Sequence, residues 1–416
     1  MTTLHPPAGH VLAGRYRRVR EQTLQLCAGL SAEDMMVQSM PDASPAKWHL
    51  AHTTWFFEQF VLGRDPRYRP RDPAWHFLFN SYYQSVGPMH ARPQRGLLSR
   101  PALEEVLAYR RHVDEAVSER LLRDQDEALA PLVTLGLQHE QQHQELLLTD
   151  IQHALWCNPL LPAYLREAPR SAIRSGSMAL EFLPGREGVL EIGSAGEGFA
   201  FDNETPRHAV LLAPHTLASR PVTNEEFAAF VHDGGYREPS LWLSDGWATV
   251  QHEGWQRPLY WQPDLASVFG LAGVRALDPA APACHLSYYE ADAFARWAGA
   301  RLPTEAEWEA AAAALPVEGN LLDGAPHPPQ AAARPGLAQM YGDVWEWTAS
   351  PYIAYPGFRP LPGSLGEYNG KFMCGQWVLR GGSCATPCDH VRASYRNFFP
   401  PQARWQFAGL RLARDR

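Results

Sequence analysis

Two histidines four residues apart, His139 and His143, stand in the polar stretch at residues 138–145. The stretch belongs to a run at about residues 127–156 in which apolar and histidine positions recur at steps of three and four, as on one helical face. Residues four apart on a helix are neighbours, so both imidazoles can reach one metal ion. Many helices carry such a pair by chance, so the hypothesis of a metal-holding helix requires a histidine from elsewhere.

His52 is the candidate for that further histidine, because it lies in a predicted helix at residues 45–62, between two tryptophans. Trp48, His52 and Trp55 share one face of this helix. A histidine in such surroundings is usually buried, and a buried imidazole needs a polar partner. The partner is either a backbone carbonyl or a metal ion, and the local sequence alone leaves both open.

The elements that must position these residues are four helices, predicted at residues 12–30, 45–62, 101–122 and 127–156. Ser44 is predicted to cap the second helix, with Pro45 at its first position. Four helices with one long crossover predict a four-helix bundle, in which metal sites are built from facing helices. The crossover at residues 64–100 is rich in proline, aromatic and basic residues. A loop of this length without periodicity is uncommon unless it is functional.

The composition is that of an ordinary globular protein and excludes several function classes. Apolar residues make up 45% and charged residues 20% of 416 positions, a length that suits two or three domains. The net charge of -8, without a run of Lys or Arg, argues against nucleic acid as a partner. No stretch approaches the roughly 18 apolar residues of a membrane span, and the N-terminus lacks an apolar signal core, so we expect a cytoplasmic protein. Six cysteines in this length do not indicate a disulfide framework.

The second half of the chain has a different character, with short strand-like pieces separated by Gly, Pro, Asn and Trp. Strands are predicted at residues 189–193 and 209–212, and helices at residues 224–231 and 287–298. The rest is rich in turns. The pattern predicts an α+β domain at residues 189–416, joined by a connector at residues 157–188 to a helical domain at residues 1–156.

Five stretches of the second half resemble the formylglycine-generating-enzyme (sulfatase-modifying-factor) fold, a C-type-lectin-like domain. They lie at residues 221–225, 301–309, 342–348, 379–383 and 409–411, in the order of that family. The first half, with Leu50-Ala51-His52 and the His139 to His143 segment, resembles the DinB-like four-helix metal bundle. Their fusion resembles the iron-dependent sulfoxide synthases of ergothioneine biosynthesis, a family that includes the selenoneine synthases. The resemblance covers nearly the whole chain and implies a multidomain α plus α+β protein.

The resemblance implies an Fe(2+) site formed by His52, His139 and His143. His49 and His153 compete for this role, but they suit it less because ligands from facing helices must meet at one level. Asp150 and Glu140 are plausible acceptors behind the ligands, although exposed carboxylates are the commoner case.

The resemblance also assigns residues to the two organic substrates. Those for the first substrate are Gln142, Asn397, Phe398 and Phe399, with Arg396 directly before them, and those for an acidic thiol donor are Arg92 and Arg95. The catalytic tyrosines of one branch fall on Tyr82 and Tyr83. Another branch has a tyrosine just before the Leu-Arg-Gly-Gly-Ser stretch, where this chain has Trp377 and no tyrosine. On composition alone, a core position is favoured for the two phenylalanines. The two arginines could equally belong to a solvated loop.

The implied reaction joins sulfur or selenium to the imidazole of hercynine, the trimethylated betaine of histidine, with O₂ as oxidant. The donor stays open between γ-glutamylcysteine, cysteine and a selenosugar, and the oligomeric state stays open as well. The active site is expected between the domains. A metal-dependent thiol transferase is an alternative that does not require the second domain, and a lectin-like binding module on a structural bundle is a non-enzymatic one.

Cys384 and Cys388 form a close pair near the C-terminus. Formylglycine-generating enzymes bind copper with a cysteine pair in this region. The spacing here is one residue tighter, so a chance or structural role is favoured.

Overall fold

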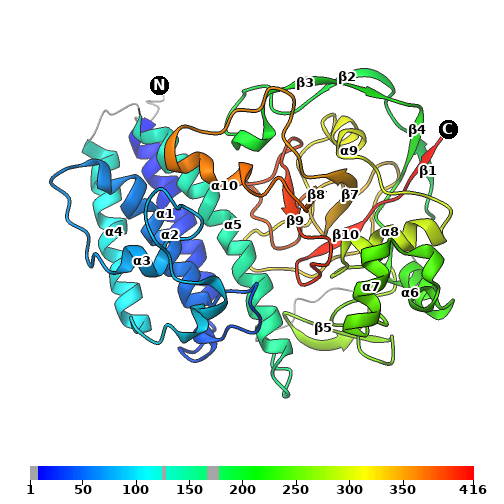
Figure 1. The fold of residues 1–416 in the computed structure, drawn as a ribbon, viewed down its shortest axis with the longest axis horizontal. Helices are drawn as coiled ribbons and strands as arrows, with labels where there is room; N and C mark the ends of the chain where they lie inside the picture. The colour runs from blue at the N-terminus through cyan, green and yellow to red at the C-terminus, as the bar shows by residue number, and fades with distance from the viewer. Residues whose placement is uncertain (1–7, 124–127, 166–177) are drawn as a thin grey trace, which may run out of the picture. The chain divides into compact units, whose positions relative to one another are not determined.

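The computed structural model describes residues 8–123, 128–165 and 178–416. The chain divides into two compact units, Met1–Asn158 with Gly363–Glu367, and Pro159–Pro362 with Tyr368–Arg416. The first unit is helical, and the second combines short helices with small sheets (Figure 1). The predicted fold class, a helical bundle followed by an α+β domain, is therefore confirmed.

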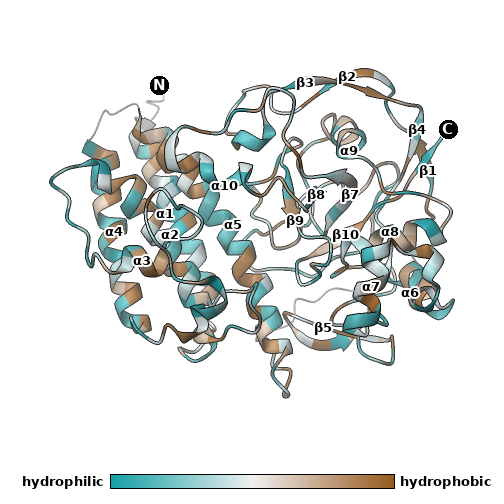
Figure 2. Cartoon of the chain, in the orientation of Figure 1, coloured by the Kyte–Doolittle hydropathy of each residue, from teal (hydrophilic) through white to brown (hydrophobic). Residues whose placement is uncertain are grey.

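Four long helices build the first unit: α1 (Ala8–Cys27), α2 (Ala46–Phe60), α4 (Leu103–Arg123) and α5 (Leu129–Trp156). α1 and α2 each pack against both α4 and α5. Hydrophobic and hydrophilic residues occur side by side along these helices, as the coloured ribbon shows (Figure 2). The buried residues of α4 include Val106, Tyr109, Val113 and Val117. Among the described residues, no helix has both the length and the apolarity to cross a bilayer.

The connections of the first unit contain short helices: η1 (Asp34–Met36), η2 (Leu62–Arg64), α3 (Trp75–Phe79) and η3 (Arg92–Leu97). The predicted Ser44 cap of α2 is wrong, because α2 begins at Ala46 with Pro45 as its N-cap and without a side-chain cap bond. The Ser44 N–H donates instead to Asp150 Oδ2 at 2.7 Å, and its hydroxyl accepts a bond from Arg95 at 2.9 Å. Tertiary partners therefore use both polar groups of the serine.

A buried ionic network joins all four helices next to the predicted metal site. Glu140 of α5 accepts from Arg20 Nη1 of α1 at 2.8 Å and from Arg110 Nη2 of α4. Arg20 also donates to Asp114 of α4 at 2.6 Å and to Thr54 of α2 at 2.9 Å. Burial alone would raise the pKa of Glu140, but the two guanidinium groups hold it at about 2. The carboxylate next to His139 is thus a structural anion and not an exposed one.

The second unit holds small sheets and short helices. Its strands are β1 (Phe182–Pro184), β2 (Gly188–Ile192), β3 (His208–Leu212), β4 (His215–Ala218), β5 (Ser267–Gly270), β6 (Gly273–Ala276), β7 (Trp345–Pro351), β8 (Trp377–Arg380), β9 (Asn397–Phe399), β10 (Ala408–Leu410) and β11 (Ala413–Asp415). They form sheets in the orders β1-β4-β11, β10-β7-β8-β9, β2-β3 and β5-β6. β1 lies in the segment that was interpreted as a connector, where no strand was predicted.

The helices of this unit are α6 (Asn224–His232), α7 (Ser244–Glu253), α8 (Tyr288–Trp297), α9 (Glu305–Ala312) and α10 (Glu367–Gly370), of which the first residue, Glu367, belongs to the first unit. Its short 3₁₀ helices are η4 (Asp202–Glu204), η5 (Gly235–Arg237) and η6 (Pro239–Leu241). The 3₁₀ helix η7 (Gly363–Gly366) belongs to the first unit. α6 and α8 were predicted within a residue at each end, and Thr223 caps α6. α7 and α9 were not predicted.

The stretches that carry the family resemblance in this unit form its framework. Thr304 caps α9 by accepting from the N–H of Glu307 at 3.2 Å, and Glu307 accepts from the N–H of Thr304 at 2.7 Å. Trp308 Nε1 donates to Glu346 at 2.7 Å, and the same carboxylate pairs with the buried Arg411 at 2.7 Å. Buried charges of this kind require partners, so these residues specify the fold and not the chemistry.

Candidate metal centre

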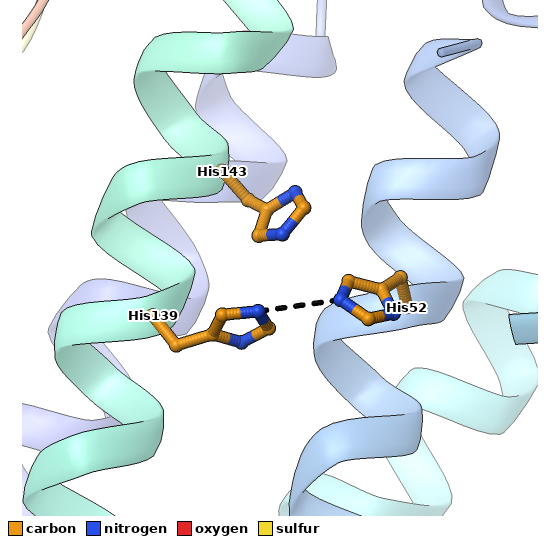
Figure 3. A group of neighbouring side chains, drawn as sticks. All are labelled: His52, His139 and His143. Atoms are coloured by element: carbon orange, nitrogen blue, oxygen red, sulfur yellow. Dashed lines mark hydrogen bonds between the residues drawn. The ribbon is translucent and has the colours of Figure 1, made fainter. Parts of the chain in front are cut away.

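Three histidines of the first unit converge on one point. His139 and His143 project from successive turns of α5, and His52 faces them from α2 (Figure 3). One ring nitrogen from each lies within 4.8 Å of the others. His52 Nε2 and His139 Nε2 are 3.2 Å apart. Two nitrogens bound to one ion at about 2.0–2.1 Å each lie about 3 Å apart, so this pair has ligand spacing.

All three imidazoles are held in the neutral form that binds metals. Burial lowers the pKa of His139 to about 4. Burial first, and the neighbouring His139 second, place the pKa values of His52 and His143 well below the usual range. The Nδ1 atom of His52 lies 2.6 Å from the carbonyl of Phe79, so Nδ1 carries the proton and Nε2 keeps its lone pair. No proton has to be displaced when an ion enters at neutral pH.

Aromatic rings enclose the histidines. Trp48 stacks on His52 with ring centroids 4.5 Å apart, and Trp55 stacks on the same ring at 5.7 Å. Phe56 lies against His139 at 4.6 Å. These contacts fix the ring orientations and exclude water from one side of the site, which strengthens electrostatic interactions there.

Arg95 is a buried cation beside this aromatic wall. Its guanidinium lies 3.4 Å from the ring centroid of Trp48, and its side chain is only 5% exposed. It donates to the hydroxyls of Ser44 at 2.9 Å and Ser81 at 2.8 Å, and burial lowers its pKa to about 9. Within the described residues, neither hydrogen bond ends on a carboxylate. A buried cation with neutral partners is suited to receive an anion, and the alternative of a solvated loop does not describe Arg95.

Tyr82 and Tyr83 have different surroundings. Tyr82 adopts a left-handed backbone with φ of 68°, which is uncommon for a residue with a side chain, and its hydroxyl accepts from Arg92 at 2.8 Å. Tyr83 is buried and its ring packs on Phe60 at 5.1 Å and Trp55 at 5.8 Å. The half-buried Tyr82 is therefore the more accessible of the two hydroxyl-bearing residues.

A carboxylate from a distant part of the sequence holds the turn after these tyrosines. Glu367 accepts the N–H groups of Gln84 and Ser85 at 3.0 Å each, and it also accepts from the Ser85 hydroxyl. The Ser364 hydroxyl lies 2.7 Å from the Ser85 hydroxyl and can donate to it. The segment Gly363–Glu367 thus belongs to the first unit by contact, although it lies about 280 residues further along the chain.

The other expected site residues lie on α5 and in β9. Gln142 is half-buried on α5, three residues after His139 and therefore on the same helical face. Asn397, Phe398 and Phe399 form β9 in the second unit. Successive side chains of a strand point to opposite faces, so Asn397 and Phe399 share one face and Phe398 lies on the other.

Contacts in the second unit agree with that alternation. Phe398 stacks on Tyr352 at 4.1 Å, and Phe399 pairs across the sheet with Trp377. Trp377 in turn stacks on Tyr288 at 4.0 Å.

Arg396, directly before β9, is fully engaged in the fold and not available to a ligand. It donates to Glu305 at 2.9 and 3.0 Å and to two backbone carbonyls, and it is 2% exposed. The expected ligand-binding segment therefore begins at Asn397.

All six cysteines are thiols in the structure, in agreement with the absence of a disulfide framework. Cys384 is buried and Cys388 is exposed. The two therefore have unlike environments.

His49 acquires a role that the sequence did not assign, and it links the triad to Asp150, which was considered as an acceptor behind the ligands. His49 was considered as a competing ligand, but its ring bonds to His143 and to Asp150 at 2.8 and 3.1 Å. A signal was present in the spacing, since His49 lies three residues before His52 and Asp150 lies seven after His143.

A helical bundle carrying three convergent histidines, followed by a sulfatase-modifying-factor domain, defines the class of this protein. Residues 15–147 match the DinB superfamily, and residues 182–324 and 324–416 match the sulfatase-modifying factor enzyme 1-like domain. The chain is 36% identical to a hercynine oxygenase of Mycolicibacterium thermoresistibile, over 100% of this chain and 97% of the relative. It belongs to the hercynine oxygenase family, which confirms the resemblance seen in its motifs.

Two further relatives fit this membership. A hercynine oxygenase of Mycolicibacterium smegmatis is 34% identical, over 98% of this chain and 99% of the relative. A formylglycine-generating enzyme of Streptomyces coelicolor is 31% identical, over 56% of this chain and 88% of the relative. Similarity to the hercynine oxygenase thus extends over nearly the full length, and similarity to the formylglycine-generating enzyme extends over about half of the chain.

Proposed function

We propose that this protein is an Fe(2+)- and O₂-dependent enzyme that joins sulfur or selenium to the imidazole of hercynine. The observation that carries the proposal is the triad formed by the buried His52 and His139 and the half-buried His143, in a chain related over its full length to hercynine oxygenases. The neutral imidazoles suit iron, and also zinc, copper or nickel. When bound, an Fe(2+) ion would supply O₂ activation and a template for the two substrates.

The residues around the triad divide the remaining work. Gln142, on the face of α5 that carries His139, would contact hercynine. Asn397, Phe398 and Phe399 of the second unit would bind the betaine, because a quaternary ammonium gains about 0.5–2 kcal/mol over an aromatic face. Asn397 and Phe399 share one face of β9 and would contact the betaine from that face. Phe398 lies on the opposite face of the strand.

The donor and the proton would be handled by the loop between α2 and α4. Arg95, buried and bonded only to hydroxyls among its described contacts, would hold a carboxylate of a thiol donor. Tyr82 would hold a proton at its hydroxyl oxygen, where Arg92 orients it by donating a hydrogen bond.

The test is product mass after incubation of the iron-loaded protein with hercynine, O₂ and equal concentrations of γ-glutamylcysteine, cysteine and a selenosugar. A hercynine product carrying sulfur or selenium, formed only with O₂, is the expected result. Exclusive sulfur product would eliminate the selenium branch and exclusive selenium product the sulfur branch. A product that forms without O₂ would favour a thiol transferase, and no product with any donor would overturn the proposal.

Arg95→Met should separate the donor classes. If the donor binds by a carboxylate, the KM for that donor should rise by about 30-fold or more, because truncating one partner of a buried charge pair costs about 2 kcal/mol or more. Steady-state kinetics with each donor measure the effect, and metal content should stay at the wild-type level. Arg69→Met, a change at an exposed arginine of the same loop, is the matched control. An unchanged KM for every donor would remove Arg95 from the donor site.

A further inference from the structure

His49 connects a metal-binding histidine to a buried carboxylate. It lies on α2, three residues before His52, and is 2% exposed. Its Nδ1 atom is 2.8 Å from Nδ1 of His143, and its Nε2 atom is 3.1 Å from Oδ2 of Asp150. Asp150 is 6% exposed and is fixed by the N–H of Ser44 at 2.7 Å. The three side chains form a continuous chain, Asp150 to His49 to His143.

The direction of each hydrogen bond follows from the carboxylate. An ionised carboxylate only accepts, so His49 Nε2 carries the proton that points to Asp150. For a neutral His49 imidazole, which has one N–H, Nδ1 is then the acceptor and Nδ1 of His143 is the donor. The lone pair of His143 is then on Nε2. A bond in the opposite direction would leave the His143 proton on Nε2.

The geometry at the triad requires that lone pair. Figure 3 shows one ring nitrogen of His143 directed towards the His52 and His139 pair. Because Nδ1 of His143 bonds to His49, the directed nitrogen is Nε2. A proton there would point at the place where an ion must bind.

His49 itself has the position of a support and not of a ligand. Its Nδ1 atom lies 2.8 Å from Nδ1 of His143, an ordinary hydrogen-bond length, and His49 is not one of the three histidines whose ring nitrogens converge. His52 obtains the same kind of support from the backbone carbonyl of Phe79. The support of His143 comes from side chains and can therefore be changed by substitution.

We propose that His49 and Asp150 are positioning residues, which hold His143 in the Nδ1–H tautomer and so prepare its Nε2 for the metal. The inference rests on the proposed metal-dependent function. The positioning role is distinct from that function, because it concerns metal affinity whether or not hercynine is converted. Loss of such supporting partners typically weakens metal binding or activity 10–100-fold.

The experiment measures Co(II) affinity by chelator competition, together with the visible spectrum of bound Co(II), in the full-length protein. His49→Leu and Asp150→Leu should each weaken Co(II) binding about 10–100-fold. Asp150→Asn should lose less, since the amide oxygen still accepts from His49 and preserves the tautomer. His153→Ala is the control, because His153 bonds to Ser39 and lies outside this chain of contacts.

The outcomes separate the alternatives. Wild-type Co(II) affinity in both His49→Leu and Asp150→Leu would overturn the inference, as would equal losses for Asp150→Leu and Asp150→Asn. A visible spectrum that loses one nitrogen ligand in His49→Leu would make His49 a ligand and overturn the positioning role. Should His49→Leu misfold by circular dichroism, the Asp150 pair decides the question. Failure of the proposed function is read separately, from absence of product with the iron-loaded wild-type protein.

Discussion

His139→Ala is expected to abolish turnover and to remove the iron, while most of the helical content remains. The substitution deletes one of three neutral ligands and leaves two, which do not complete a site in which substrate and O₂ share the ion. The bundle should persist because Glu140 and Arg110 tie the helices together independently of the metal. Metal analysis, oxygen uptake with hercynine and far-UV circular dichroism measure the three effects.

His153→Ala provides the matched control, since it removes an imidazole from the same helix fourteen residues after His139. It should keep wild-type iron content, because His153 bonds to Ser39 and is not part of the triad. Normal iron and activity in His139→Ala would refute the ligand assignment. So would loss of iron in His153→Ala with an intact fold.

Tyr82→Phe should lower the rate of carbon–sulfur or carbon–selenium bond formation by about 10²–10⁴-fold, the usual contribution of a positioned acid or base. The change removes only the hydroxyl that Arg92 orients at 2.8 Å. Iron content and hercynine affinity should stay unchanged, because neither depends on that oxygen. Single-turnover product formation is the measurement.

Tyr83→Phe is the natural comparison, because the neighbouring tyrosine is buried in the aromatic cluster with Phe60 and Trp55. We expect its rate to fall less than that of Tyr82→Phe. The reverse order would transfer the catalytic role to Tyr83. Equal wild-type rates in both variants would remove the proton-donor role from this loop.

The long helices could be predicted from local patterns. The 3.6-residue period located α5 within two residues at either end, and α6 was predicted within one residue at either end. α9 was missed because it is short and weakly patterned. Its first residue, Glu305, is stabilised by Arg380 and Arg396, which lie far along the chain. Ser44 does not cap α2, because its N–H donates to Asp150 and its hydroxyl accepts from Arg95, both of which lie far along the chain.

The sequence by itself determined that His139 and His143 lie on one helical face, because residues four apart are neighbours on any α-helix. It also indicated that His52 is enclosed by tryptophans. Only the tertiary structure decided what lies behind these ligands. The bond from His49 to Asp150 and the burial of Arg95 against Trp48 join residues about 50 to 100 positions apart. No local period encodes such contacts, since they exist only after the helices have packed.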